Sequence, residues 1–90
     1  MAQAVVDPAE MRRFAQQLRH FCNDLGTQMG SVKAQLNGLS QTWRDQEHVK
    51  FANEFDQTMV VLARFLEAAE QHVPFLMRKA DRIEEYLQQR

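Results

Sequence analysis

The chain has 90 residues, enough for a single small domain over residues 1–90. Hydrophobic residues make up 44% of it and charged residues 26%, which favours a folded chain over a disordered one. The net charge of −1 with intermixed signs argues against a nucleic-acid partner, and no apolar run approaches the ~18 residues of a membrane-spanning helix.

The N-terminal residues predict the start of a long helix. Asp7 is a favourable N-cap, Pro8 suits the first helical position, and Glu10 follows the cap by three residues. Upstream of this start, the chain lacks the basic residues and the apolar core of a signal peptide. We therefore expect a protein without a removable leader.

The first helix is expected over about 8–40, because apolar residues recur there at steps of three or four and so share one face. These residues are Met11, Phe14, Leu18, Phe21, Leu25, Met29, Val32, Leu36 and Leu39.

A stripe of small residues, Cys22, Gly26, Gly30 and Ala34, runs beside this apolar seam at four-residue spacing. The stripe is either a groove in which another helix comes close or a weak helical segment that packing tolerates. Cys22 is the only cysteine, so it cannot form an internal disulfide. It is either a small buried hydrophobe or a thiol available for intermolecular pairing or reaction.

Residues 36–55 predict the reversal of the chain. Gly38 can take a positive φ at the end of the first helix. Trp43, the only tryptophan, lies between the two helical patterns, where it can fix the angle between the helices. Trp43 either fills the end of the core or contacts a partner directly. Asp45 and Glu47 place negative charge in the first turn of the next helix, which the helix dipole favours.

The second helix is expected over about 46–88. Pro74 lies inside its apolar pattern without disturbing the phase, which favours a kinked helix over a new loop. The main seam consists of Phe51, Phe55, Met59, Leu62, Leu66, Ala69, Val73, Leu76, Ala80, Ile83 and Leu87. A second apolar row beside it consists of Val61, Phe65, Ala68 and Phe75.

The two helices differ in length, at roughly 46 and 63 Å. If the chain folds back at Trp43, residue 8 lies opposite about residue 77. The residues beyond that point then have no first helix to pack on, and they contact the N-terminal arm, contact a partner chain or stay mobile. They are Ala80, Ile83, Tyr86 and Leu87.

No catalytic or metal-binding constellation is recognisable. The chain has no Gly-rich phosphate loop, no Cys-x-x-Cys and no His-Glu-x-x-His. Asp45 and His48 have the spacing of two metal ligands on one helix face, but the apolar seams offer no further carboxylates. His20, His48 and His72 are expected on polar faces. We expect neither an enzyme nor a cofactor.

The second apolar row and the small stripe exceed what one hairpin can bury. Pairing of two all-α antiparallel hairpins into a four-helix bundle is the simplest way to cover them. We expect the dimer interface to use Val61 and Phe65 together with Cys22, Gly26 and Gly30.

The residues of the reversal also carry a family resemblance. Trp43 is followed by Phe51 eight residues on and by Phe55 four further, with Leu36 and Leu39 upstream. Together with the chain length and the helix–turn–helix plan, this pattern resembles the WXG family. Members are small leaderless hairpins exported by type VII (ESX-like) secretion systems, and the similarity covers nearly the whole chain.

The resemblance implies a function in protein–protein contact. The chain would be secreted or held in the cell envelope without a signal peptide, and cytoplasmic before export. Its partners would be a second copy or another WXG-like hairpin, and also a larger secreted effector and a secretion ATPase. The alternative is an intracellular hairpin that serves as an adaptor or chaperone for a partner protein.

Two positions depart from the family pattern. Asp45 stands where the family has Gly two residues after the tryptophan, and an Asp there can cap the second helix. The family's C-terminal export signal, a Tyr followed four residues later by an acidic residue, maps onto Tyr86 and Arg90. The usual signal is therefore incomplete unless a partner chain carries it. Ile83 and Tyr86 are the residues expected to form a C-terminal docking segment.

Overall fold

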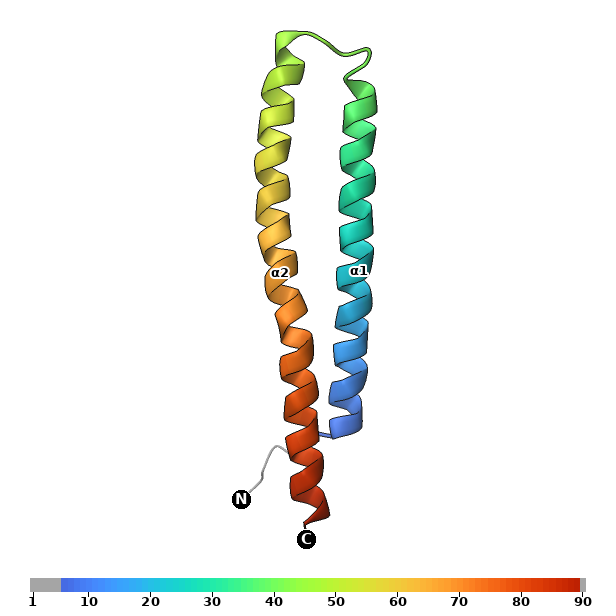
Figure 1. Cartoon of the computed structure of the whole chain (residues 1–90), viewed down its shortest axis with the longest axis vertical. Helices are drawn as coiled ribbons and strands as arrows, with labels where there is room; N and C mark the ends of the chain where they lie inside the picture. The colour runs from blue at the N-terminus through green and yellow to red at the C-terminus, as the bar shows by residue number, and fades with distance from the viewer. Residues whose placement is uncertain (1–5, 90) are drawn as a thin grey trace.

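The computed structural model describes residues 6–89, which form two long antiparallel helices. Helix α1 spans Pro8–Leu39 and helix α2 spans Gln46–Gln88. The molecule is a thin rod of 69 × 21 × 16 Å, with the start of α1 and the end of α2 at the end opposite the connection (Figure 1). The all-α hairpin predicted from the sequence is confirmed. Most of the N-terminal arm and Arg90 lie outside the described residues.

Both helix starts are capped as expected. The Asp7 carboxylate accepts a hydrogen bond from the Ala9 amide at 2.9 Å, and Pro8 occupies the first turn. At the second helix, the Asp45 carboxylate accepts from the His48 amide at 3.0 Å. Asp45 has φ −85°, so the turn does not need the glycine that the family places here.

The end of α1 differs from the expectation. Gly38 is helical, and no residue of 6–89 has a positive φ, so the predicted left-handed glycine is wrong. The helix ends instead in further right-handed turns, in which the amides of Thr42 and Trp43 donate to the Leu39 carbonyl. These hydrogen bonds satisfy the carbonyls at the helix end without a glycine.

Helix α2 continues through Pro74 without a break, as the uninterrupted apolar phase predicted. Proline has no amide hydrogen, so the hydrogen bond to the Glu70 carbonyl is missing. Both residues are exposed, which leaves water to solvate that carbonyl.

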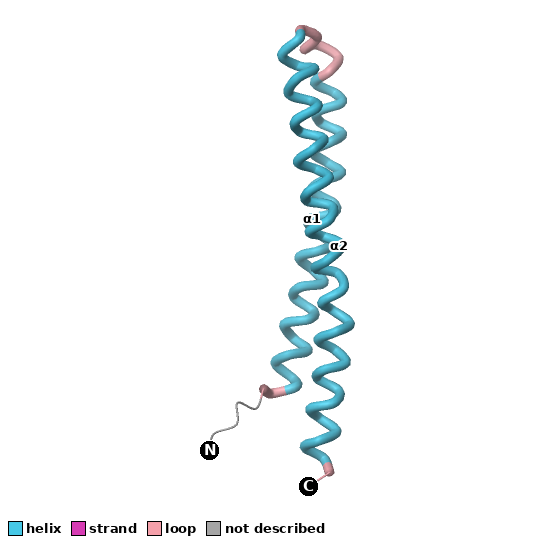
Figure 2. The backbone as a smooth tube through the Cα atoms, turned by 90° about the vertical axis from the view of Figure 1, so that its left-hand side faces the viewer, coloured by secondary structure: helices cyan, strands magenta, loops and turns pink. Residues whose placement is uncertain are grey.

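The helices meet along a narrow seam of small side chains. Among the described residues, the buried ones are Ala15, Cys22, Ala69, Val73 and Ala80. Such side chains let two helices approach closely, and α1 and α2 cross near mid-length in the side view (Figure 2).

The predicted seam of α1 is therefore partly wrong. Phe14 and Phe21, expected in the core, are 59% and 49% exposed, and Val32 and Leu39 are exposed as well. Ala15 and Cys22, one position further along the chain, occupy the seam instead. The close contact between the helices leaves no room for large rings there, so the rings flank the seam. The seam of α2 agrees with the prediction except at its exposed ends, Phe51 and Leu87.

The register of the two helices also differs from the expectation. Arg12 pairs with Asp81 at 2.8 Å and with Glu84 at 2.6 Å, so the start of α1 lies opposite residues beyond 80 rather than near 77. The first turns of α2 extend past the end of α1, and the connection runs beside them (Figure 1). Ala80 is consequently 0% exposed, and the predicted overhang shortens to the last turn, from Tyr86 onward.

Candidate interaction surfaces

The first candidate surface is the hairpin tip, which we define as residues 40–45 and the first turns of α2. The Trp43 ring lies against α2, with its centroid 5.0 Å from the His48 ring and 5.9 Å from the Phe51 ring. Phe51 in turn stacks on Phe55 at 5.9 Å. The structure thus brings together the three aromatic residues of the expected turn motif. Trp43 is half-buried, and Phe51 is 44% exposed.

The tip also contains a polar contact that the sequence analysis missed. The His48 ring nitrogen Nε2 lies 2.9 Å from the Ser40 hydroxyl, which is itself 3.1 Å from the Leu36 carbonyl oxygen. His48 was expected on a polar face, but its side chain is half-buried and lies against the connection, where it contacts Ser40 and Trp43. The available signal was a serine at the end of one helix and a histidine in the first turn of the next.

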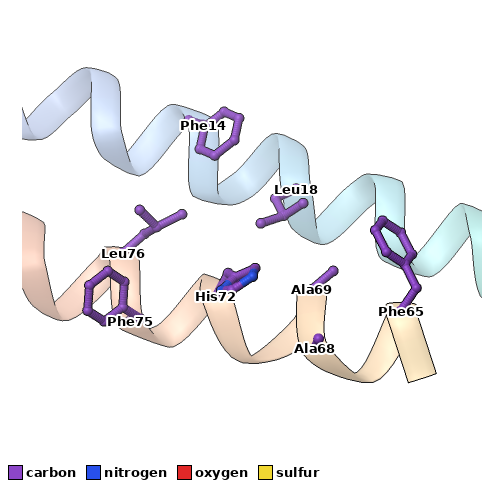
Figure 3. A pocket seen from close by; sticks show the side chains of 8 residues that line it. All are labelled: Phe14, Leu18, Phe65, Ala68, Ala69, His72, Phe75 and Leu76. Carbon is purple, nitrogen blue, oxygen red and sulfur yellow. The ribbon is translucent and has the colours of Figure 1, made fainter. Parts of the chain in front are cut away.

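The second candidate surface is an aromatic face on one side of the seam, which we define by Phe14, Phe21, Val61, Phe65 and Phe75. It encloses a hollow of about 400 Å³ with Phe14 above it and Phe65 and Phe75 along its α2 side (Figure 3). The other lining residues are Leu18, Ala68, Ala69, His72 and Leu76.

The rings of the aromatic face are largely uncovered in a single chain. Phe14, Phe65 and Phe75 are 59%, 51% and 56% exposed. Phe21 packs edge-on against Phe65 at 6.4 Å, which joins the two helices across the face. Val61 is 64% exposed and lies one helical turn before Phe65, on the same side of α2. The second apolar row predicted for α2 is therefore solvent-facing in the monomer.

The small stripe of α1 does not lie on this face. Cys22 is buried within the hairpin, and a Cβ at Gly26 would meet Leu66 of α2 at 3.6 Å. The helix that comes close to this part of α1 is therefore α2 of the same chain. Cys22 and Gly26 have little surface left for a second chain, which corrects the expected interface. Gly30 has open space beside it.

The environment of Cys22 favours the reading of this residue as a small buried hydrophobe. Burial raises the pKa of the Cys22 thiol, and the nearby Glu70 carboxylate raises it further. A raised pKa lowers the fraction of reactive thiolate at neutral pH.

The opposite side of the seam carries charged residues in the half of the rod away from the tip. Arg12 lies there between Asp81 and Glu84, and hydrogen bonds to these two carboxylates raise the pKa of its guanidinium. Arg19 and Glu70 line a shallow pocket on this side. Nearer the tip, the same side has a mainly apolar groove of about 410 Å³, lined by Met29, Gly30, Lys33, Asp56, Met59, Val60 and Ala63. The aromatic rings thus lie on one side of the hairpin, and the other side combines charged residues with this groove.

The C-terminal segment is less free than predicted. Ile83 is half-buried, and its neighbour Glu84 is paired with Arg12. Of the two expected docking residues, Tyr86 alone projects into solvent, at 69% exposure.

Within residues 6–89, no group of three or more His, Cys, Asp or Glu side chains is arranged to hold a metal ion. In the same range, neither helix has an apolar stretch that could cross a membrane.

Comparisons with known proteins give a family match and a shared fold. A family model for proteins of 100 residues with WXG, WXG100, matches residues 3–86. The crystal structure of the secreted protein EsxB from Bacillus anthracis str. Sterne superposes with a TM-score of 0.80 at 23% identity, covering 96% of this chain and 98% of that one. The wild-type EsxB structure gives 0.80 at 24% identity, with 92% and 89% covered. No curated protein sequence is significantly similar to this chain.

Proposed function

The chain belongs to the WXG100 family, and from this premise we propose that it is a small protein of a type VII (ESX-like) secretion system. It acts through helix–helix contacts and leaves the cytoplasm folded, as a pair of hairpins. The observation that carries the proposal is the match over residues 3–86 on a hairpin whose aromatic face is uncovered.

The size of the uncovered surface supports pairing. Phe14, Phe21, Phe65 and Phe75 are each about half exposed, so a partner can cover on the order of 100 Å² on each ring. At ~25 cal/mol per Å², the four rings contribute about 10 kcal/mol per chain. For two chains this is of the same order as the ~4–15 kcal/mol that association costs before side-chain ordering, so the aromatic face is large enough to support pairing, although its area does not fix the affinity. The partner that covers the aromatic face is a second copy of this chain or another WXG-like hairpin with a matching apolar face.

The hairpin tip and the last turn of α2 lie at opposite ends of the rod (Figure 1). Neither contains a residue that defines the aromatic face. Both stay accessible when two hairpins pair side by side. We assign the contact with a secretion ATPase to the segment that contains Tyr86, because this side chain is the most exposed large one near the C-terminus. Because Arg90 replaces the family's acidic residue, the partner hairpin or a larger effector supplies the complete signal.

An intracellular adaptor or chaperone with the same hairpin is the second candidate. The aromatic face favours it equally, since a groove for a helix of a client protein has the same apolar character. The two candidates differ in where the protein ends up.

The test is fractionation of the native organism. The full chain is expected in the culture supernatant or envelope, and its export is expected to stop when the secretion ATPase is deleted. Removal of residues 86–90 is expected to stop export as well, without affecting Ala80 or the Arg12 ion pairs. Retention of the intact chain inside cells with a working ATPase would leave only the adaptor.

A further inference from the structure

Three residues close together at the tip come from three segments of the chain. Ser40 directly follows α1, Trp43 lies in the connection, and His48 lies in the first turn of α2. The Ser40 hydroxyl lies within hydrogen-bonding distance of both His48 Nε2 and the Leu36 carbonyl oxygen. A hydroxyl has one hydrogen and a carbonyl oxygen has none, so the direction of each bond can be assigned.

The short distance between Ser40 Oγ and the Leu36 carbonyl fixes that direction. The Ser40 hydroxyl donates to the Leu36 carbonyl oxygen at 3.1 Å, because the carbonyl has no hydrogen to donate. The single hydrogen of Ser40 is then committed to Leu36. The contact of 2.9 Å between Ser40 Oγ and His48 Nε2 therefore requires the imidazole to donate. The resulting relay runs from His48 Nε2–H to Ser40 Oγ–H and on to the Leu36 carbonyl.

His48 also holds the tip by two further contacts. Its backbone amide donates to the Asp45 carboxylate at 3.0 Å. Its ring meets the Trp43 indole edge-on, at 77° between the planes. His48 thus touches the end of α1, the connection and the cap of α2.

We propose that His48 is the positioning residue of the hairpin tip: its Nε2–H, bonded to Ser40, holds the Trp43 ring in one orientation against α2. This hydrogen bond takes the place of a turn that depends on a glycine, since the tip contains no residue with a positive φ. The inference does not rest on the proposed export role.

The first experiment measures the tautomer directly. Long-range ¹H–¹⁵N spectra of the full chain at pH 8 report which ring nitrogen of His48 carries the hydrogen. The Nε2–H form is expected. The Nδ1–H form would overturn the proposal, because Nε2 could then only accept.

The second experiment removes the donor and restores it. In His48→Ala, exchange of the Trp43 amide, which donates to Leu39, is expected to accelerate about fivefold to tenfold, the effect of one lost hydrogen bond. His48→Gln is expected to recover most of the protection, because its side-chain amide can donate from a similar distance. His20→Ala removes an exposed histidine from the middle of α1 and serves as the control.

Ser40→Ala provides an independent variant in case His48→Ala unfolds. It is expected to change the near-ultraviolet signal of Trp43 and the amide exchange as His48→Ala does. The double variant is expected to be no worse than His48→Ala, because that variant already removes the bond to Ser40 together with the ring contact to Trp43. Additive effects, equal effects of Ala and Gln at position 48, or a Trp43 signal unchanged in Ser40→Ala would each overturn the proposal.

Discussion

A pair of substitutions at neighbouring valines of α2 tests the aromatic face with a built-in control. Val61 is 64% exposed and lies one turn before Phe65 on the aromatic face. Val60 is 50% exposed and lines the groove with Lys33 on the other side. Val61→Asp and Val60→Asp introduce the same side chain into the same helix. Because both sites face solvent in a single chain, we expect the two variants to have monomer stabilities within ~0.5 kcal/mol of each other.

The expected difference arises on pairing. Val61→Asp places an unpaired carboxylate in the interface, which costs several kcal/mol per buried charge, and a twofold pair contains two of them. A total of ~3 kcal/mol already weakens association by about a hundredfold. Val60→Asp leaves its carboxylate in water and is expected to pair as the unmodified chain does.

Sedimentation equilibrium over a range of micromolar concentrations gives the dissociation constants, and circular dichroism checks that both variants remain helical. Dissociation by Val60→Asp with no effect of Val61→Asp would refute the aromatic face as the contact. Equal weakening by both would refute it too. A well-folded monomer of the unmodified chain would exclude self-pairing and leave a second, different hairpin as the partner.

Further expectations concern stability. Trp43→Ala is expected to cost about 1.5–3 kcal/mol, below the ~3–5 kcal/mol of a fully buried aromatic because the ring is half-buried, while Asp45→Gly costs a few tenths. Thermal unfolding decides this, and equal small shifts would show that Trp43 is not structural. Pro74→Ala restores a helical hydrogen bond and is expected to stabilise by ~1–3 kcal/mol in denaturant unfolding, whereas a loss would show that α2 needs its proline. Because burial raises the pKa of Cys22, its stabilising effect is fully present below the unfolded thiol pKa and is lost as the pH rises through the folded pKa. Unfolding at neutral and alkaline pH should show a steeper loss in the native chain than in Cys22→Ala, and identical pH dependence would contradict the assignment.

Local signals predicted the elements well. The caps at Asp7 and Asp45 and the unbroken phase across Pro74 depend on residues within one turn of each other, and the structure agrees with each of them. The seam of α1 was harder to assign. Phe14 and Ala15 are adjacent, and the apolar periodicity fits a seam through either; only the close approach of α2 decides for the smaller residue.

The contacts between the helices could not be predicted from one sequence. The register depends on the path of the connection. Helix lengths alone placed residue 8 opposite about residue 77 of α2, which is several residues too near the turn. Arg12 therefore meets Asp81 and Glu84, which no local pattern indicates. The contact between Ser40 and His48 has the same origin, because it exists only when the connection rises along the first turns of α2.

The smallness of the seam has a consequence for the lifetime of the fold. Among the described residues, the buried core of one hairpin amounts to three alanines, one cysteine and one valine, which is little to hold two long helices together. If the aromatic face pairs as proposed, much of the folding free energy comes from the second chain, so the melting temperature rises with protein concentration. Dilution below the dissociation constant then shifts the population toward open chains, which proteases cleave readily. The same sequence is thus long-lived where it is concentrated and short-lived where it is dispersed.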